Sequence, residues 1–278
     1  MHRKTQTSSL CGLLCAAALL VAYPAEARQD DQGGGGSADL AKQLSNPVSS
    51  LVSVPLQFNW ESPVGPEDDT RFVLNFQPVM PFSLNDKWNA ITRVIIPIVG
   101  QPALTRGGVP ASGISDVLVS MFFSPAEPGA FIWGVGPVMS LPSTNERTLG
   151  SQKWSAGPTA LVLKQSGPWT YGALWNHVWS FAGNNTRSDV SQMFVQPFLS
   201  YTTPKAVTFA INSEAVGNFE ADSDKWTVPL NLQITKVLSF GQFPASYGVG
   251  YGIYLAGPDS APSWKLRGLI TVLLPRTR

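Results

Sequence analysis

The sequence predicts an all-β protein, a transmembrane antiparallel up-and-down β-barrel of about twelve strands that follows a cleaved signal peptide. Three observations favour this fold: a repeated alternation of apolar and polar residues, two rows of aromatic residues, and a low content of charge. Residues 51–61 show the alternation most clearly, because Val52, Val54, Leu56, Phe58 and Trp60 fall on one parity and polar residues or proline on the other. In an extended chain these two sets point to opposite faces, so the stretch is a strand with one apolar face.

Composition indicates a protein whose outer surface is largely apolar. Charged residues make up 13% of the chain and aromatic residues 10%, with nine tryptophans, which is little charge for a soluble protein. The 19 basic and 18 acidic residues nearly balance, so no basic field exists for nucleic acid. The expected partners are outer-membrane lipid, lipopolysaccharide and a small-molecule solute, in the outer membrane of a Gram-negative bacterium. The sequence leaves the oligomeric state open.

Residues 1–27 read as a secretory signal peptide. A basic start precedes an apolar run over 10–21, and Ala25-Glu26-Ala27 is a small-x-small cleavage site. No later stretch reaches the ~18 consecutive apolar residues of a spanning helix, so strands must carry the chain through a membrane. Both cysteines, Cys11 and Cys15, lie in the signal, and the mature chain is expected to have no disulfide.

Residues 28–50 are expected to form a flexible N-terminal segment with a short helix. Four consecutive glycines, 33–36, cannot bury surface, and 39–44 combines an acidic start with helix formers before Asn46-Pro47. Two readings stay open for this segment. It is either a small plug or periplasmic handle, or an ordinary tether that leads into the first strand of the barrel, which occupies 51–278.

Twelve strands are expected, joined by connections that alternate between short and long. Their lengths suit tilted strands that cross the hydrocarbon with ~9 to 11 residues. An even number of strands with short turns at one end places both termini in the periplasm. The expected strands are 51–61, 70–82, 88–99, 113–123, 130–141, 153–163, 169–181, 190–202, 206–215, 225–237, 243–255 and 263–274.

Aromatic residues gather near both ends of these strands, as rings do where hydrocarbon meets headgroups. A soluble sandwich, the alternative fold, has no reason to place rings in two rows. The outer row is Trp60, Phe72, Trp154, Trp179, Phe181, Trp226 and Trp264, and the inner row is Phe82, Trp88, Phe123, Phe131, Trp169, Tyr201 and Phe243.

Prolines inside the expected strands argue against a regular ladder, because each removes one hydrogen-bond donor. Bulges are expected to accommodate them. The prolines are Pro55, Pro78, Pro97, Pro137, Pro158, Pro197 and Pro229.

Four short motifs resemble a known family. They are Ser53-Val-Pro-Leu-Gln, Gly157-Pro-Thr, Trp179-Ser-Phe-Ala-Gly and Gln196-Pro-Phe-Leu-Ser-Tyr. They look like the bacterial outer-membrane barrels labelled as transporters or phenol meta-pathway proteins, some carrying the label neuromedin U, and the resemblance covers 39–275. It implies an outer-membrane barrel that passes small hydrophobic or aromatic molecules. The chain departs from the wider outer-membrane habit of ending on an aromatic residue, since it closes on Pro275-Arg-Thr-Arg278.

Catalytic and metal chemistry have little support in the sequence. The mature chain has one histidine, His177, and Ser180 three residues later points to the opposite face of a strand. The acidic run Glu67-Asp68-Asp69 reads as a solvated loop rather than a cation site. We therefore expect no enzyme, no cofactor and no metal. The alternatives are an outer-membrane lipid-modifying enzyme and a structural or adhesive barrel.

The parity opposite the apolar stripe predicts the inward face of the barrel. It is rich in amides and carries both signs of charge, so the interior is expected to be wet and either an open conduit or a filled hydrogen-bonded network. Arg93 and Asp116 are expected to face each other, and the glycines of 248–252 to leave room inside the wall. The candidate lumen-lining residues are Gln57, Asn59, Arg71, Asn75, Gln77, Arg93, Asp116, Gln192, Gln196, Asn231, Gln233, Lys265 and Arg267.

These patterns predict a passive channel. Its solutes are expected to be small, with hydrophobic or aromatic ones included, and to move down a gradient without a cofactor.

Overall fold

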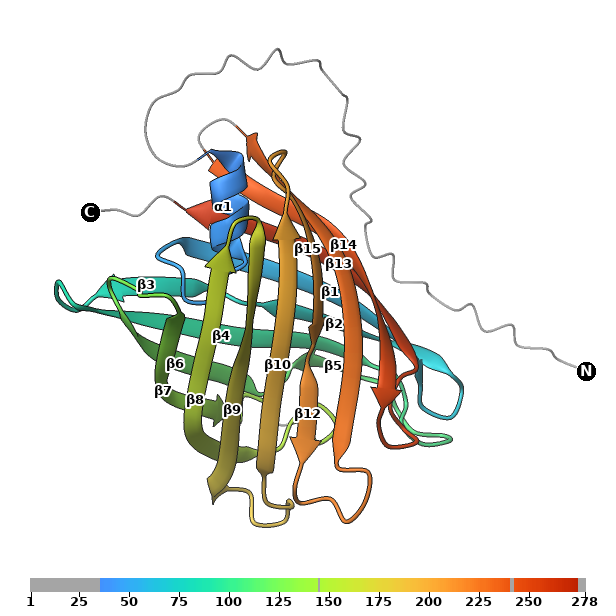
Figure 1. Cartoon of the computed structure of the whole chain (residues 1–278). Coiled ribbons are helices and arrows are strands. Elements are labelled where there is room, and N and C mark those ends of the chain that lie inside the picture. Colours follow the sequence, from blue (N-terminus) through green and yellow to red (C-terminus); the bar gives the residue numbers. More distant parts are fainter. Residues whose placement is uncertain (1–35, 145, 241–242, 275–278) are drawn as a thin grey trace, which may run out of the picture. The chain divides into compact units, whose positions relative to one another are not determined.

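The computed structural model describes residues 36–144, 146–240 and 243–274 (Figure 1). The expected signal peptide, the first part of the N-terminal segment and the closing residues 275–278 lie outside the described residues. No helix in the described part of the chain has the length and apolar character needed to cross a bilayer.

One short helix precedes a single sheet of fifteen strand segments (Figure 1). The helix is α1 (Ser37–Leu44). The strands are β1 (Val52–Val64), β2 (Asp69–Phe76), β3 (Val79–Ser83), β4 (Trp88–Gln101), β5 (Ala111–Ile114), β6 (Val117–Pro125), β7 (Ile132–Leu141), β8 (Lys153–Ser166), β9 (Trp169–Gly183), β10 (Ser191–Thr202), β11 (Val207–Ser213), β12 (Ala215–Asn218), β13 (Trp226–Phe240), β14 (Phe243–Ala256) and β15 (Trp264–Leu274).

The sheet closes into a barrel of twelve antiparallel crossings, as expected from the sequence. β1 pairs along its length with β15, from Val52 opposite Leu274 to Ser62 opposite Trp264, and β9 pairs with β10, so the described strands close into a ring. Three of the twelve crossings are each made of two strand segments. β2 and β3 both pair with β1 and β4, β11 and β12 both pair with β10 and β13, and β5 and β6 both pair with β4. Closure pairs the backbone polar groups within the wall, which is the requirement for a sheet in lipid.

The two ends of the barrel differ in the length of their connections. We call the end with the short turns, such as 84–87 and 167–168, the inner end, and the end with the longer loops, such as 102–110 and 142–152, the outer end. One outer connection is much shorter than expected. β1 continues to Val64 and β2 begins at Asp69, so the first loop is only 65–68. The ladder extends there because Val64 pairs with Asp69 after a bulge.

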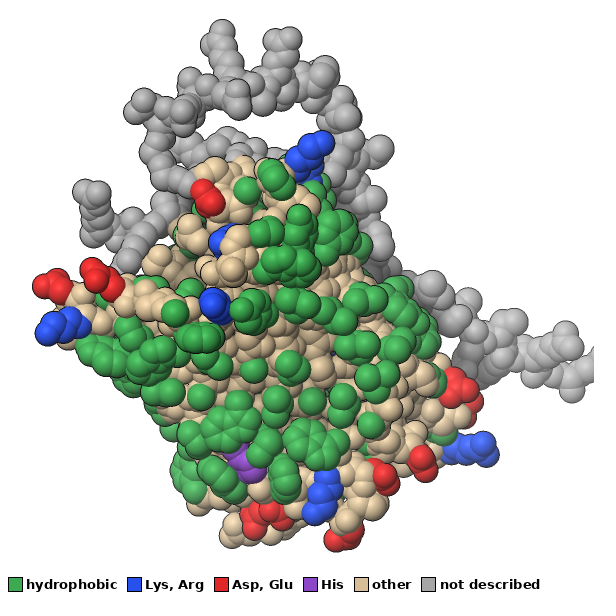
Figure 2. Space-filling view, in the orientation of Figure 1, with side chains coloured by type: hydrophobic (Ala, Val, Ile, Leu, Met, Phe, Trp, Pro, Cys, Tyr) green, Lys and Arg blue, Asp and Glu red, His purple; other side chains and the backbone are tan. Residues whose placement is uncertain are grey.

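The outer surface of the strands is apolar, and charged side chains gather at the ends (Figure 2). Leu232, Val249 and Tyr251 in the middle of the wall are about half exposed. Near the ends lie exposed rings such as Trp179 and Trp169, and the Trp169 ring meets Tyr201 edge to face at 4.9 Å. A soluble sandwich would bury such a face, so this alternative is excluded and the membrane barrel remains.

The prolines sit where the ladder is already interrupted. Each of the seven lies in a gap of the register with one neighbouring strand. For example, Gln196 and Pro197 fall between the part of β10 that pairs with β11 and the part that pairs with β12. A proline there loses no ladder bond, and its carbonyl still accepts, as Pro55 O does from Gln77 N at 2.9 Å. The expectation of bulges is met only at Pro97 and Pro229, where the register shifts by one residue; at the other five prolines the register continues unchanged across the gap.

The interior is only partly wet, which corrects the expectation from the sequence. An apolar cluster fills the inner half of the barrel on the side of β4, β6, β8 and β9. The alternation predicted that apolar residues face lipid. Phe122 instead points inward, between the outward Met121 and Phe123. A strand that is apolar on both faces has no alternation from which the inward residues could be predicted. The buried members of the cluster are Val48, Val79, Ile91, Phe122, Leu161, Leu163 and Leu174.

The orientation of β13 leads to a test of the wall. Leu232 is 56% exposed on the outer face, whereas its neighbour Gln233 lines an inner cavity. Leu232→Arg should lower the free energy of unfolding by about 2 to 4 kcal/mol, because it places a charge in mid-membrane. Urea titration in lipid vesicles, followed by tryptophan fluorescence, measures the change.

Gln233→Arg is the matched control, since the new charge enters the interior. We expect Gln233→Arg to lower the free energy of unfolding clearly less than Leu232→Arg does. Equal losses at the two positions would show that the wall is turned over by one residue.

Candidate functional site: the interior of the barrel

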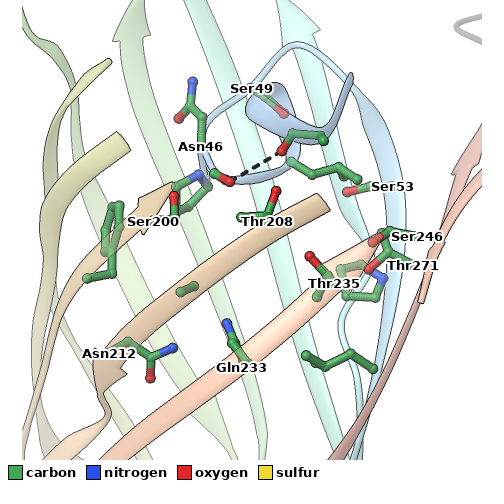
Figure 3. A pocket seen from close by; sticks show the side chains of 18 of the residues that line it. Asn46, Ser49, Ser53, Ser200, Thr208, Asn212, Gln233, Thr235, Ser246 and Thr271 are labelled. Carbon is green, nitrogen blue, oxygen red and sulfur yellow. Dashed lines mark hydrogen bonds between the residues drawn. The ribbon is translucent and has the colours of Figure 1, made fainter. Parts of the chain in front are cut away.

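Within the described part of the chain, three cavities lie inside the barrel. The inner cavity, of about 260 Å³, is bounded by α1 and the following turn, and its wall is rich in hydroxyl and amide groups (Figure 3). The first outer cavity, of about 570 Å³, reaches the loop 257–263. The second outer cavity, of about 470 Å³, lies beside β6, β9 and β10. All three share one residue, Arg93.

The helix α1 closes the inner end on one side. Ala41 is buried against Ala206 and Val237, and Gln165 Nε2 donates to Lys42 O at 2.9 Å. Val48 continues from this segment into the apolar cluster. The residues after the helix therefore lie over the inner cavity, with Asn46 and Ser49 directed toward the space that Thr208 and Ser200 also face (Figure 3).

The structure places all thirteen candidate residues on the inner side of the wall, in two groups. Asn59, Asn231 and Arg267 are buried within side-chain bonds: Arg267 Nε donates to Asn59 Oδ1 at 2.8 Å, and Asn231 Nδ2 donates to Asn212 Oδ1 at 2.8 Å. The other ten line one or more of the three cavities. They are Gln57, Arg71, Asn75, Gln77, Arg93, Asp116, Gln192, Gln196, Gln233 and Lys265.

Glu214 organises the charged wall of the first outer cavity, and the sequence reasoning missed it. It occupies the gap between β11 and β12 and accepts from Arg267 Nη1 at 3.0 Å, Arg267 Nη2 at 2.6 Å and Lys265 Nζ at 3.2 Å. The fork of Arg267 makes this pair bidentate, which is the strong arrangement. The alternation could have predicted that Glu214 faces inward, because Glu214 has the same parity as the inward Asn212.

A second acid, Glu61, was also missed and holds the outer rim of the same cavity. Arg71 Nε donates to Glu61 Oε2 at 2.8 Å, and the Tyr254 hydroxyl donates to Glu61 Oε1 at 2.9 Å. Lys265 Nζ lies 5.5 Å from the centre of the Tyr254 ring. The two acids and their bases thus form one connected polar wall along β1, β2, β14 and β15.

Glycines make room for this wall. A Cβ on Gly252 would lie 2.5 Å from Asn231 Oδ1 and 2.9 Å from the Lys265 side chain. A Cβ on Gly248 would lie 2.3 Å from Ile234 O. The expectation that these glycines leave space inside the wall is confirmed.

Arg93 and Asp116 do not pair, which corrects the expectation from the sequence. Arg93 is opposite Ser120 in the register of β4 with β6 and donates through Nη2 to Gln77 Oε1 at 2.6 Å. Asp116 lies in the gap between β5 and β6, where Ser151 N and Oγ donate to it at 2.7 and 2.6 Å. Ser120, four residues after Asp116, takes the position opposite Arg93, so strand parity, which fixes the face but not the register, could not locate Asp116.

The second outer cavity carries acidic groups. Asp116 and Asp189 line it, and Lys153 Nζ donates to Asp189 Oδ1 at 2.9 Å. Asp189 is in the loop 184–190, and the hydrogen bonds from Lys153 and Ser180 hold the pKa of its carboxyl below the usual value.

His177 has a serine partner that the sequence reasoning did not find. His177 Nε2 lies 3.2 Å from Ser191 Oγ on the neighbouring strand β10, and both residues face outward. The imidazole stacks on Trp179 at 4.1 Å. A nucleophilic pair also needs a group that orients the imidazole and donors for the oxyanion. Among the described residues no other side chain hydrogen-bonds to His177, so the pair reads as a polar contact within the aromatic row.

Metal binding has no support in the described ranges. No three His, Cys, Asp or Glu side chains gather there as ligands would. Glu67, Asp68 and Asp69 are all exposed around the first outer turn.

Comparisons with known proteins identify the fold. No family model and no curated protein matches the sequence. The COG4313 outer membrane channel from Pseudomonas putida F1 is similar in structure, with a TM-score of 0.60 at 14% identity over 81% of this chain and 96% of that chain. The NanC porin has a TM-score of 0.52 at 10% identity over 80% of this chain and 100% of that chain. With its closed ladder and apolar belt, the chain has the β-barrel fold of these outer-membrane proteins, as expected.

The buried acid gives a stability test. Glu214→Gln should lower the free energy of unfolding by about 3 kcal/mol, because Lys265 and Arg267 would stay charged inside the wall without their carboxylate. Urea titration in vesicles measures the loss. Glu67→Gln, on an exposed turn, is the control and should leave stability unchanged; the same loss in both variants would contradict the buried network.

The histidine pair gives a test of enzymatic activity. We expect the purified protein to release fatty acid from phospholipid micelles no faster than Ser191→Ala. His177→Phe should keep the stacking on Trp179 and the folded barrel. Release by the wild type that either substitution abolishes would make the chain a lipid hydrolase.

Proposed function

We propose that the chain is a passive channel in the outer membrane for small solutes, hydrophobic and aromatic ones included. The observation that carries the proposal is the chain of cavities from the helix to the outer loops. The inner and first outer cavities share Gln57, Gln77, Arg93 and Gln196. A solute could therefore pass from one to the next by displacing side chains rather than strands.

The two-sided wall favours solutes with an apolar part. Phe194 lines both outer cavities and Phe198 lines the inner one, while Gln57 of β1 lines the inner and first outer cavities and Lys265 of β15 lines the first outer one. Cavities of 260 to 570 Å³ hold small molecules and exclude polymers. The family resemblance of the sequence motifs, to phenol meta-pathway outer-membrane barrels, points to the same class of solute.

The surroundings follow from the surface. Outer-membrane lipid would cover the apolar belt, and lipopolysaccharide would meet the outer loops. No cofactor enters the proposal, because diffusion down a gradient requires none.

Liposome swelling tests the channel directly. Vesicles with the full mature chain should swell faster in small solutes than vesicles without protein, and much less in disaccharides. Equal rates with and without protein for every solute would overturn the proposal and favour a structural or adhesive barrel.

The helix supplies a second test. Removal of residues 37–47 should raise single-channel conductance several-fold, since this segment covers the inner cavity. Replacement of the same residues by glycine and serine is the length-matched control. It should also raise single-channel conductance, but by a smaller factor than removal. Unchanged conductance on removal would make the segment a tether that does not limit passage.

A further inference from the structure

We infer that Arg93 binds the anionic group of the solute, so the channel takes small apolar molecules that carry one negative charge, such as aromatic carboxylates. This inference rests on the proposed channel function and names its substrate class.

The position of Arg93 is the first argument. It lines all three cavities, and among the described residues it is the one ionisable side chain that lines the inner cavity. Any solute that moves between the outer cavities and the inner cavity therefore passes the guanidinium of Arg93.

The unused hydrogen-bonding capacity of Arg93 is the second argument. The other cations of the interior face acids: Arg71 is 2.6 Å from Glu61, Lys153 is 2.9 Å from Asp189, and Glu214 takes both Lys265 and Arg267. Among the described residues, Arg93 donates to a single side-chain acceptor, the neutral amide of Gln77, and the carboxylate of Glu214 acts on Arg93 only through space, without a hydrogen bond between them. A guanidinium has five donors in a planar fork that matches a carboxylate, so most of them remain for a ligand.

The neighbours of Arg93 supply the apolar half of the site. Ile95 and Phe194 line both outer cavities beside it. Val79 is its partner in the register of β3 with β4 and lines the inner cavity with Phe198. A flat ring could lie against Phe194 on the outer side of Arg93 or against Phe198 on its inner side, while its carboxylate meets the fork.

Charge also distinguishes the two outer routes. The first outer cavity is lined by three bases, Arg71, Arg93 and Lys265, and two acids. The second is lined by Arg93 with Asp116 and Asp189, so its acids outnumber its base. Anions should therefore enter through the first outer cavity, and cations should be disfavoured at Arg93 itself.

Planar-bilayer recordings of the full mature chain test the inference with two ions of similar size, benzenesulfonate and benzyltrimethylammonium. The wild type should prefer benzenesulfonate, and this anion should block chloride current at a measurable half-blocking concentration. Arg93→Gln should raise that concentration roughly tenfold, the loss expected for a hydrogen bond to a charged group. Arg93→Lys should have a half-blocking concentration between those of the wild type and Arg93→Gln, because lysine keeps the positive charge but lacks the planar fork of donors.

Arg106→Gln, at an exposed position of the loop 102–110, is the matched control. It removes one positive charge outside the three cavities, so it should leave both the ion preference and the half-blocking concentration near the wild-type values. Gel mobility of unheated samples checks that each variant is folded. If current flows but Arg93→Gln leaves block and ion preference unchanged, the inference is overturned and the channel stands. If the wild type passes neither ion nor any other solute, the proposed function itself fails.

Discussion

The constraint on which the rest of the structure depends is the pairing of backbone polar groups inside a membrane. An unpaired N–H or C=O costs several kcal/mol in hydrocarbon, so the sheet must close and its ladder must run without edges. This chain meets the requirement by pairing β1 with β15. Interruptions are then tolerated only where the freed groups find other partners, and the seven prolines occupy such interruptions.

The same interruptions shape the interior. Where β11 gives way to β12, Glu214 enters the lumen and gathers Lys265 and Arg267. Where β5 gives way to β6, Asp116 turns toward Ser151. Buried charge is costly unless it is paired, so the wall joins most of its cations to carboxylates and surrounds them with amides. Arg93 departs from that rule, and this departure gives the interior its one strong candidate for binding a solute.

The apolar cluster narrows the interior of the barrel. Ile91, Phe122 and Leu163 fill one side of the inner half, and α1 covers part of the other. A barrel of twelve strands lies between those filled by side chains and the wide porins. What remains is a row of small cavities with one polar and one apolar side, which is suited to small amphiphilic molecules.

The sequence by itself determined the number of strands and the lipid-facing side, and it predicted an inward position for the thirteen polar candidates. Alternation was sufficient because the period of a strand is two and one face must be apolar in lipid. Only the tertiary structure decided which inward groups meet. Glu214 and Arg267 are 53 residues apart, and His177 and Ser191 belong to different strands. Parity gives a face, but partners depend on register, which the alternation leaves open. The inner core escaped prediction for the same physical reason, since Phe122 lies in a strand that is apolar on both faces and leaves no alternation to read.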